Sequence, residues 1–251
     1  MDLAIAVNEA GSVAQAVPMG EVRRGDQVVI GREGVRVTPL QRPRERDVFG
    51  FMESQISAER PHAHIIADVA TRMRQMRERH RERQSDSHVL LAGGPAIIHA
   101  GGREALTWLI EQGFIHILFC GNALAAHDME ADLFGTSLGY GLTAGRAVPH
   151  GHEHHLRTIN RIRAIGSIQA AVESGVIKRG IMAACVRAGV QVVMAGTIRD
   201  DGPLPGVITD SMQAQAAMRE AVPGVGLALL VASTLQGGMA LPPNAGVWAA
   251  I

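Results

Sequence analysis

The chain has 251 residues, and its 24 Lys plus Arg balance its 24 Asp plus Glu. A chain without net charge carries no global field that would attract nucleic acid or a membrane surface. Its length allows one large domain or two small ones, and a hydrophobic content of 47% is enough for a substantial core. No apolar run approaches the roughly 20 residues of a membrane-spanning helix. The N-terminus lacks the pattern of a secretion signal, so we expect a soluble cytoplasmic protein.

Residues 1–58 favour a small β-rich subdomain. Short apolar runs at 3–7, 28–30 and 35–37 are separated by Gly and Asp turns. Residues 59–86 then predict a connecting amphipathic helix, because apolar side chains recur there at helical spacing. Its second half carries six arginines, interleaved with glutamates. This pattern is typical of a solvated helix face, and a nucleic-acid patch is the less favoured alternative.

Residues 87–251 predict a Rossmann-like dinucleotide-binding domain. Buried strands are expected at 89–93, 114–120, 190–195 and 226–232, and helices at 103–110, 123–134, 153–174 and 181–188. Strands that alternate with helices form a parallel sheet with both faces covered. The fold class is therefore α/β, preceded by the β-rich subdomain. Residues 246–251 read as a strand at the very end of the chain, which suggests a shortened sequence.

The domain is organised around a glycine-rich stretch that follows its first strand. Gly93 and Gly94 close the strand, and Gly101 and Gly102 precede the next helix. A strand, a glycine turn and a helix bring backbone N–H groups to a phosphate. Glycine is suited to this turn because a Cβ would block close approach. The common spacing G-x-G-x-x-G is absent, so the stretch alone is weak evidence.

Three later strand ends strengthen the prediction. Polar and small residues follow the strands at 121–130, 196–210 and 233–234. Ligands of open parallel sheets bind beyond the carboxyl ends of the strands, so these segments predict a nucleotide cleft. Asn122 stands where a side chain accepts the ribose hydroxyl, although it could instead be a left-handed turn residue. An amide would not repel a 2′-phosphate, so NAD and NADP both stay open.

Titratable side chains gather in three segments. Residues 150–155 carry four histidines, which could exchange protons, bind an anion or lie at the surface. A metal site is less favoured because no partner with zinc-ligand spacing stands nearby, and we expect none. Asp128 lies near a helix start, where a capping role and a catalytic role are equally open. The Arg-Asp-Asp run at 199–201 lies in a long loop of the kind that often carries function.

Several motifs resemble one family over nearly the whole chain. They are Gly-Gly-Pro-Ala-Ile-Ile-His-Ala-Gly-Gly at 93–102, Gly-Asn-Ala-Leu-Ala-Ala-His-Asp-Met-Glu at 121–130, Gly-Thr-Ser-Leu-Gly at 135–139, Gly-His-Glu-His-His-Leu-Arg-Thr-Ile-Asn at 151–160 and Gly-Thr-Ile-Arg-Asp-Asp-Gly-Pro-Leu-Pro at 196–205. Segments 21–26, 49–54 and 57–61 are similar to it as well. The family is the LOR/SDH conserved region. It includes archaeal-type ornithine cyclodeaminases and the C-terminal half of bifunctional arginine dihydrolase/ornithine cyclodeaminases.

The resemblance implies a domain related to the cofactor domain of deoxyhypusine synthase, with NAD(H) or NADP(H) bound. The implied reaction converts L-ornithine to L-proline and ammonia. Hydride leaves an amine-bearing carbon, the other amine attacks the resulting imine, ammonia departs, and hydride returns. Such a cycle needs a closed, dry cleft and an acid–base group near neutrality.

Residue roles follow from the same resemblance. We expect Asp128 to be catalytic with help from His127 or His155, and Asp201 or Asp210 to hold a substrate ammonium. The expected cofactor contacts are Gly93, Gly94, Pro95, Ala96, His99, Gly101, Gly102, Gly121, Asn122, Ala123, Thr136, Ser137, Gly196, Thr197, Ile198, Arg199, Asp200, Ser233 and Thr234.

Longer members of the family carry a further N-terminal β-rich region and continue past the strand that starts near Val247. We therefore expect a homo-oligomer, or a partner chain or domain that completes the substrate site. Two alternatives stay open for the function. One is an oxidoreductase of the lysine–oxoglutarate reductase/saccharopine dehydrogenase type, and the other is a dinucleotide-binding module without catalysis. A metallohydrolase based on the histidines at 150–155 is the least favoured.

Overall fold

The computed structural model describes residues 3–7, 13–18, 21–29, 62–142, 146, 148–197, 200–231 and 246–250. The predicted strand at 35–37 and the predicted contacts Ile198, Arg199, Ser233 and Thr234 lie outside these residues. The chain forms two compact units, Met1–Ile65 and Ile66–Ile251. Each unit is described by itself below.

The first unit contains a small antiparallel sheet. Its strand order is β2 (Ala14–Pro18), β1 (Leu3–Val7), β3 (Gln27–Val28). The β-rich character and the strand at 3–7 are confirmed, and the expected strand at 28–30 is found as the shorter β3. β2 was not predicted, because its sequence Ala-Gln-Ala-Val-Pro has little of the β-branched and aromatic character that favours strands.

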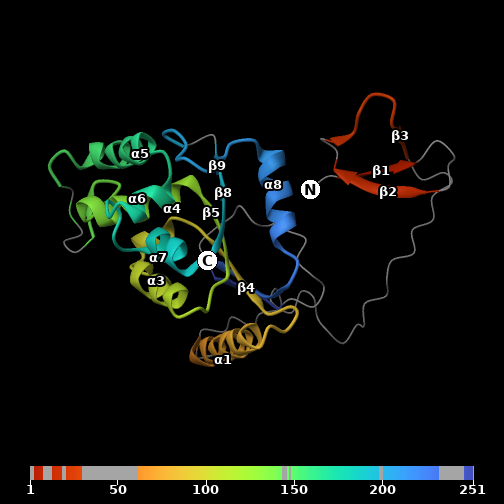
Figure 1. The fold of residues 1–251 in the computed structure, drawn as a ribbon, viewed down its shortest axis with the longest axis horizontal. Helices are drawn as coiled ribbons and strands as arrows, with labels where there is room; N and C mark the ends of the chain where they lie inside the picture. The colour runs from red at the N-terminus through yellow and green to blue at the C-terminus, as the bar shows by residue number, and fades with distance from the viewer. Residues whose placement is uncertain are drawn as a thin grey trace. The chain divides into compact units, whose positions relative to one another are not determined.

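The second unit contains a six-stranded parallel sheet (Figure 1). Its strand order is β11 (Gly246–Ala250), β10 (Val225–Val231), β4 (His88–Gly93), β5 (Ile117–Gly121), β8 (Gln191–Ala195), β9 (Val207–Ile208). The four predicted core strands and the final strand are confirmed. The edge strand β9 is an addition, and β5 begins three residues later than predicted.

The strand order reverses beside β4. From β4 the chain moves through β5 to β8 and β9, and then returns to place β10 on the other side of β4. This is the topological switch point, where open α/β sheets bind ligands beyond the carboxyl ends of their strands. The Gly94 amide donates to the carbonyl of Val231 over 3.0 Å. The glycine turn therefore lies at the switch point.

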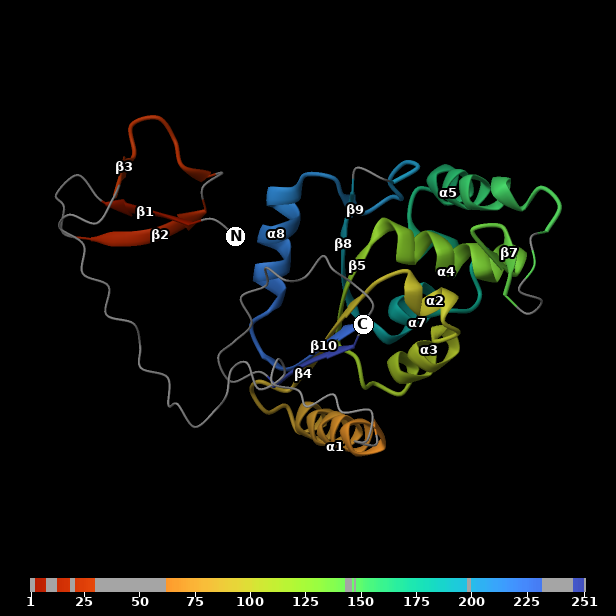
Figure 2. The same cartoon turned by 180° about the vertical axis from the view of Figure 1, so that it is seen from behind.

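Helices cover both faces of the sheet (Figures 1 and 2). One face packs against α8 (Ser211–Ala221). On the other side, one larger core cluster joins the strands to α2 (Ala96–His99), α3 (Arg103–Glu111), α4 (Asn122–Phe134), α5 (His154–Ile165), α6 (Ile168–Glu173) and α7 (Ile181–Ala188). Successive residues of a strand point to opposite faces. In β5, Leu118 accordingly joins the core under α4, whereas Phe119 joins the core under α8.

Some helix predictions need correction. The helix expected over 153–174 is two helices, since Gly166 ends α5 with φ +100° and the Ser167 hydroxyl accepts from the Ala170 amide to begin α6. The loop at 135–139 contains the strand β6 (Thr136–Ser137), which pairs with β7 (Tyr140–Gly141). A 3₁₀ turn, η2 (Gly151–Glu153), precedes α5. The helix α8 was not predicted, although Asp210 supplies an N-cap signal.

α1 (His62–Arg81) occupies the position of the predicted amphipathic helix. Met73 on α1 is buried in the larger core cluster, with Val69 and Met76 packed against that cluster. Among the described helices, none is both long and apolar enough to cross a bilayer.

Candidate active site

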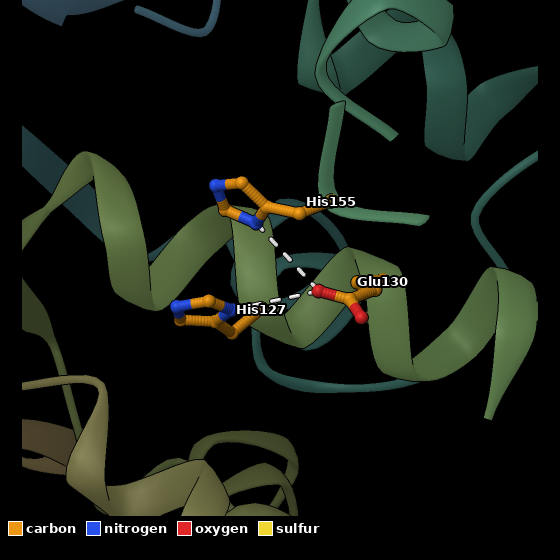
Figure 3. Close-up of side chains that lie close together, drawn as sticks. All are labelled: His127, Glu130 and His155. Atoms are coloured by element: carbon orange, nitrogen blue, oxygen red, sulfur yellow. Dashed lines mark ion pairs between the residues drawn. The ribbon is translucent and has the colours of Figure 1, made fainter. Parts of the chain in front are cut away.

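A buried carboxylate lies between two imidazoles near the carboxyl edge of the sheet. His127 and Glu130 are one helical turn apart on α4, which begins directly after β5, and His155 comes from the first turn of α5. Glu130 Oε2 lies 3.5 Å from His127 Nδ1 and 3.6 Å from His155 Nδ1 (Figure 3). All three side chains are buried.

The β6–β7 hairpin holds Glu130 in place. Thr136 Oγ1 donates to Oε1 over 2.8 Å, the Gly139 amide to Oε1 over 3.1 Å, and the Leu138 amide to Oε2 over 3.1 Å. Burial by itself raises the pKa of Glu130, but the two histidines, the Gly139 amide and Thr136 outweigh it and bring that pKa well below its usual range. These donors therefore favour the ionised form of Glu130.

His99 extends the two imidazoles into a row. Ring centroids are 5.2 Å apart for His99 and His127, and 4.8 Å apart for His127 and His155. The His99 Nδ1 lies 3.4 Å from the Ser137 hydroxyl. Burial, followed by the nearby His127, lowers the pKa of His99 against the opposing effect of Glu130. At the other end of the row, His155 Nε2 lies 3.6 Å from Asp201 Oδ2, whose side chain is 63% exposed.

The four histidines at 150–155 do not form one cluster. His150 is exposed and lies 3.6 Å from Glu153, whereas His154 Nδ1 lies 2.9 Å from Thr136 Oγ1 and its ring stacks on Phe134. The side chains of His150, His154 and His155 are described, and among these three His155 lies beside Glu130.

The ligand atoms of His127, Glu130 and His155 lie within 4.8 Å of one another, a spacing that could hold a metal ion. The sequence did not predict this group.

Asp128 lies outside the imidazole row although it follows His127 directly. Its Oδ1 accepts from Arg103 Nε over 2.7 Å and from the Ile181 amide over 2.9 Å, and its Oδ2 accepts from the Met182 amide over 2.8 Å. Burial raises the pKa of this carboxyl, while Arg103 and the two amides oppose the rise. Asp128 thus ties α3 and α4 to the first residues of α7. These contacts give Asp128 a structural role, and its predicted catalytic role stays a prediction.

Three other predicted polar residues also bind the protein itself. Asn122 is buried, donates to the Gly202 carbonyl over 3.2 Å and accepts from the Leu204 amide over 2.9 Å, so it anchors the loop after β8. Asp200 accepts from the amide and hydroxyl of Thr197. Asp210 caps α8 by accepting from the Gln213 amide over 2.8 Å. Of the predicted ammonium-binding pair, Asp201 and not Asp210 lies beside the imidazoles.

The predicted small cofactor contacts lie at the carboxyl ends of the strands. Gly93 ends β4 and residues 94–96 follow it, Gly121 and Ala123 flank the first residue of α4, and Gly196 and Thr197 follow β8. A Cβ on Gly93 would lie 3.0 Å from both Ile97 and Leu91, so glycine is also needed there for packing. Gly101 and Gly102 begin α3 a helical turn further on. Thr136 and Ser137 instead support Glu130 and His99.

Glu130 is the member of this group that was not predicted as a site residue. It stood inside the motif at 121–130, three positions after His127 on the same helical face. The spacing of three residues was the sequence signal that places Glu130 beside His127. The amides of Leu138 and Gly139, which donate to Glu130, lie eight and nine residues later, and no local pattern predicts these hydrogen bonds.

A parallel sheet with a glycine turn at its switch point defines a Rossmann-type protein. Two family profiles match the chain: "Arginine dihydrolase ArgZ-like, C-terminal, Rossmann fold" over residues 67–242, and "Arginine dihydrolase ArgZ-like, C-terminal, first region" over residues 1–66. The chain belongs to this ArgZ-like C-terminal family, and the predicted family resemblance is confirmed.

Similar proteins are considerably longer. The ornithine cyclodeaminase of Methanopyrus kandleri is 49% identical over 236 residues, which are 94% of this chain and 56% of that enzyme. The crystal structure of a putative LOR/SDH protein from Methanococcus maripaludis has a TM-score of 0.77 at 41% identity, covering 93% of this chain and 67% of that one. A ternary complex of AgrE with ornithine and NAD⁺ has a TM-score of 0.66 at 37% identity, covering 94% of this chain and 32% of that one.

Proposed function

We propose that the chain acts in an NAD(P)-dependent ornithine cyclodeaminase-type reaction, which converts L-ornithine to L-proline and ammonia. The observation that carries the proposal is the buried group of His127, Glu130 and His155 near the carboxyl edge of a Rossmann-type sheet. Membership of the ArgZ-like C-terminal family supports it, as does the AgrE complex that contains ornithine and NAD⁺. The chain spans about 56% of the archaeal relative, so another chain or domain is proposed to complete the substrate site.

The strand ends at the switch point fit a dinucleotide. Gly93 and Gly94 keep the turn after β4 free of side chains, and Gly121 stands directly before the first-turn amides of α4. Such amides have no partner within their helix and suit a pyrophosphate. When bound, the oxidised nicotinamide would accept the hydride and its reduced form would return it, so the reaction has no net redox change.

His127 and His155 are proposed to carry the proton transfers. An imidazole takes a proton from the substrate ammonium, because only a neutral amine can lose hydride or attack an imine. An imidazolium then returns a proton to the departing ammonia. Asp201 is proposed to hold a substrate ammonium, since its exposed carboxylate lies beside His155. In this proposal Asp128 takes no part in these transfers, because its oxygens accept from Arg103 and from two amides of α7.

Replacement of either imidazole is expected to lower turnover strongly. His127→Gln and His155→Gln should each reduce proline formation by about 10²–10⁴-fold, the usual contribution of general acid–base catalysis. The assay contains L-ornithine and substoichiometric NAD⁺, and follows proline and ammonia. His150→Asn is the matched control, since His150 is exposed and its left-handed conformation suits Asn. Equal activity of all four proteins would contradict the proposal.

The putative LOR/SDH neighbour favours one alternative reaction, a reductase that consumes the nicotinamide cofactor. With lysine, 2-oxoglutarate and NADPH, such a reductase would lower the absorbance of the reduced nicotinamide as NADPH is oxidised. The cyclodeaminase reaction leaves that absorbance unchanged. Mass spectrometry of the denatured protein tests the common requirement, a bound dinucleotide. No bound dinucleotide, together with no binding on addition, would exclude both reactions.

A further inference from the structure

We propose that Glu130 is a positioning residue that fixes one and the same tautomer in His127 and His155. Each ring would carry its proton on Nδ1, directed at Glu130, and present a bare Nε2 away from it. The use of these Nε2 atoms as bases rests on the proposed function. The tautomer itself depends only on the contacts within this chain.

The first argument is that Glu130 can only accept. Its two oxygens receive a hydroxyl and two backbone amides from the β6–β7 hairpin, and those donors favour the ionised carboxylate. The side chain is completely buried, so water does not compete for the carboxylate. In such surroundings a charge acts strongly on its neighbours.

The second argument is the direction of the rings. Both Nδ1 atoms face the same oxygen, Glu130 Oε2, at 3.5 and 3.6 Å. Neither has a hydrogen-bond partner at normal distance among the described residues. An unprotonated Nδ1 would direct its lone pair at a carboxylate oxygen, whereas a protonated one directs a donor at it. A neutral imidazole with its proton on Nδ1 has its acceptor at Nε2.

The third argument is that the two Nε2 atoms remain available. Both point away from Glu130 (Figure 3). Asp201 lies 3.6 Å from the Nε2 of His155, but its side chain is 63% exposed. Water therefore screens Asp201, and the buried Glu130 governs the ring. With ring centroids 4.8 Å apart, the site offers two bases to one ligand. A substrate with two primary amino groups matches this pair.

The proposal is tested by ¹⁵N NMR of the protein labelled at its 11 histidines. His127→Gln and His155→Gln assign the two rings. In the unsubstituted protein near pH 7.5, both rings should show a protonated Nδ1 and an unprotonated Nε2. Glu130→Gln should abolish this pattern in both rings, because an amide can donate as well as accept. It should also lower kcat by at least about 10²-fold, as expected when a catalytic imidazole adopts the wrong tautomer.

Glu153→Gln is the matched control. Glu153 also lies three residues from a histidine, His150, with 3.6 Å between Oε1 and Nδ1, but His150 is exposed and Glu153 only partly buried. This variant should leave the signals of His127 and His155 unchanged. If Glu130→Gln does not fold, the spectrum of the unsubstituted protein decides, since Nε2–H on either ring overturns the proposal.

Two further outcomes would also overturn it. One is an unchanged tautomer in folded Glu130→Gln. The other is stoichiometric Zn²⁺ binding that shifts both Nδ1 signals, because the group would then be a metal site. The spectra require neither substrate nor turnover. A protein that makes no proline but has the predicted tautomers would therefore contradict the proposed function and leave the role of Glu130 intact.

Discussion

Asp128 and Glu130 lie two positions apart on α4 and are both completely buried, but their contacts differ in kind. A separation of two residues turns a side chain by about 200° around a helix. Glu130 accordingly faces the imidazoles, whereas Asp128 faces Arg103 and the start of α7. Glu130 thus belongs to the group of imidazoles, whereas Asp128 ties three helices together.

Asp128→Asn is expected to destabilise the protein by about 3–5 kcal/mol, because it leaves Arg103 without its partner in a largely buried pair. Urea unfolding at pH 7.5 measures the loss. Asp68→Asn is the control, because its pair with Arg72 is about half exposed on both sides and should contribute less than about 1 kcal/mol. Equal losses in the two variants would contradict the structural role of Asp128.

At the scale of elements, a second group of histidines joins α1 to the amino-terminal edge of the sheet. His80 ends α1, His88 begins β4, and His116 precedes β5, with ring centroids of His80 and His116 3.9 Å apart. The Val89 amide donates to His116 Nδ1 over 3.0 Å. Burial first, and then His80 and His88, lower the pKa of His116 to about 4 from 6.5. The folded protein thus favours the neutral form of His116.

Stability should fall as the pH is lowered from about 6.5 to about 4. In this window the unfolded chain takes up a proton at residue 116 and the folded protein does not, so acid favours unfolding. The contribution is about 1–2 kcal/mol once solvent screening of the partly buried ring is allowed for. Urea unfolding at several pH values measures it. His116→Asn keeps an acceptor for the Val89 amide but cannot be protonated, and should flatten the curve. An unchanged slope would contradict the assignment.

At the scale of the molecule, the switch point joins loops that are far apart in the chain. Asn122 fastens the segment at 202–204 to the start of α4, and Gly94 joins β4 to β10. A ligand at this edge would contact several strand ends at once. From Ile66 onward α1 lies in the second unit, where Met73 joins the core and Arg77 lies 4.1 Å over the Phe114 ring.

A dinucleotide is therefore expected to stabilise the folded protein as a whole. At a concentration 100 times its Kd, a ligand that binds only the folded state adds about 2.7 kcal/mol to the free energy of unfolding. Thermal unfolding with increasing NAD⁺ and NADP⁺ measures this effect and separates the two cofactors. Nicotinamide alone is the control for a non-specific effect. No change in Tm with either dinucleotide at millimolar concentration would contradict the prediction.

The sequence by itself determined the features that are encoded locally. Apolar runs closed by glycine predicted β4 and β5, helical spacing predicted α1 and α3, and strand–helix alternation predicted the parallel sheet. Long motifs identified the family. Features without periodicity were missed, such as β2 and the short edge strand β9.

Only the tertiary structure decided the roles of the polar side chains. Asn122 was a candidate for a ribose contact, but its partners are backbone groups 80 and 82 residues further along the chain. Asp128 and Glu130 occur in one motif, and the contacts of α7 and of the β6–β7 hairpin distinguish them. The physical reason is that a buried polar group must be satisfied. Its donors come from whichever segments the folded chain brings next to it, and spacing along the sequence does not reveal them.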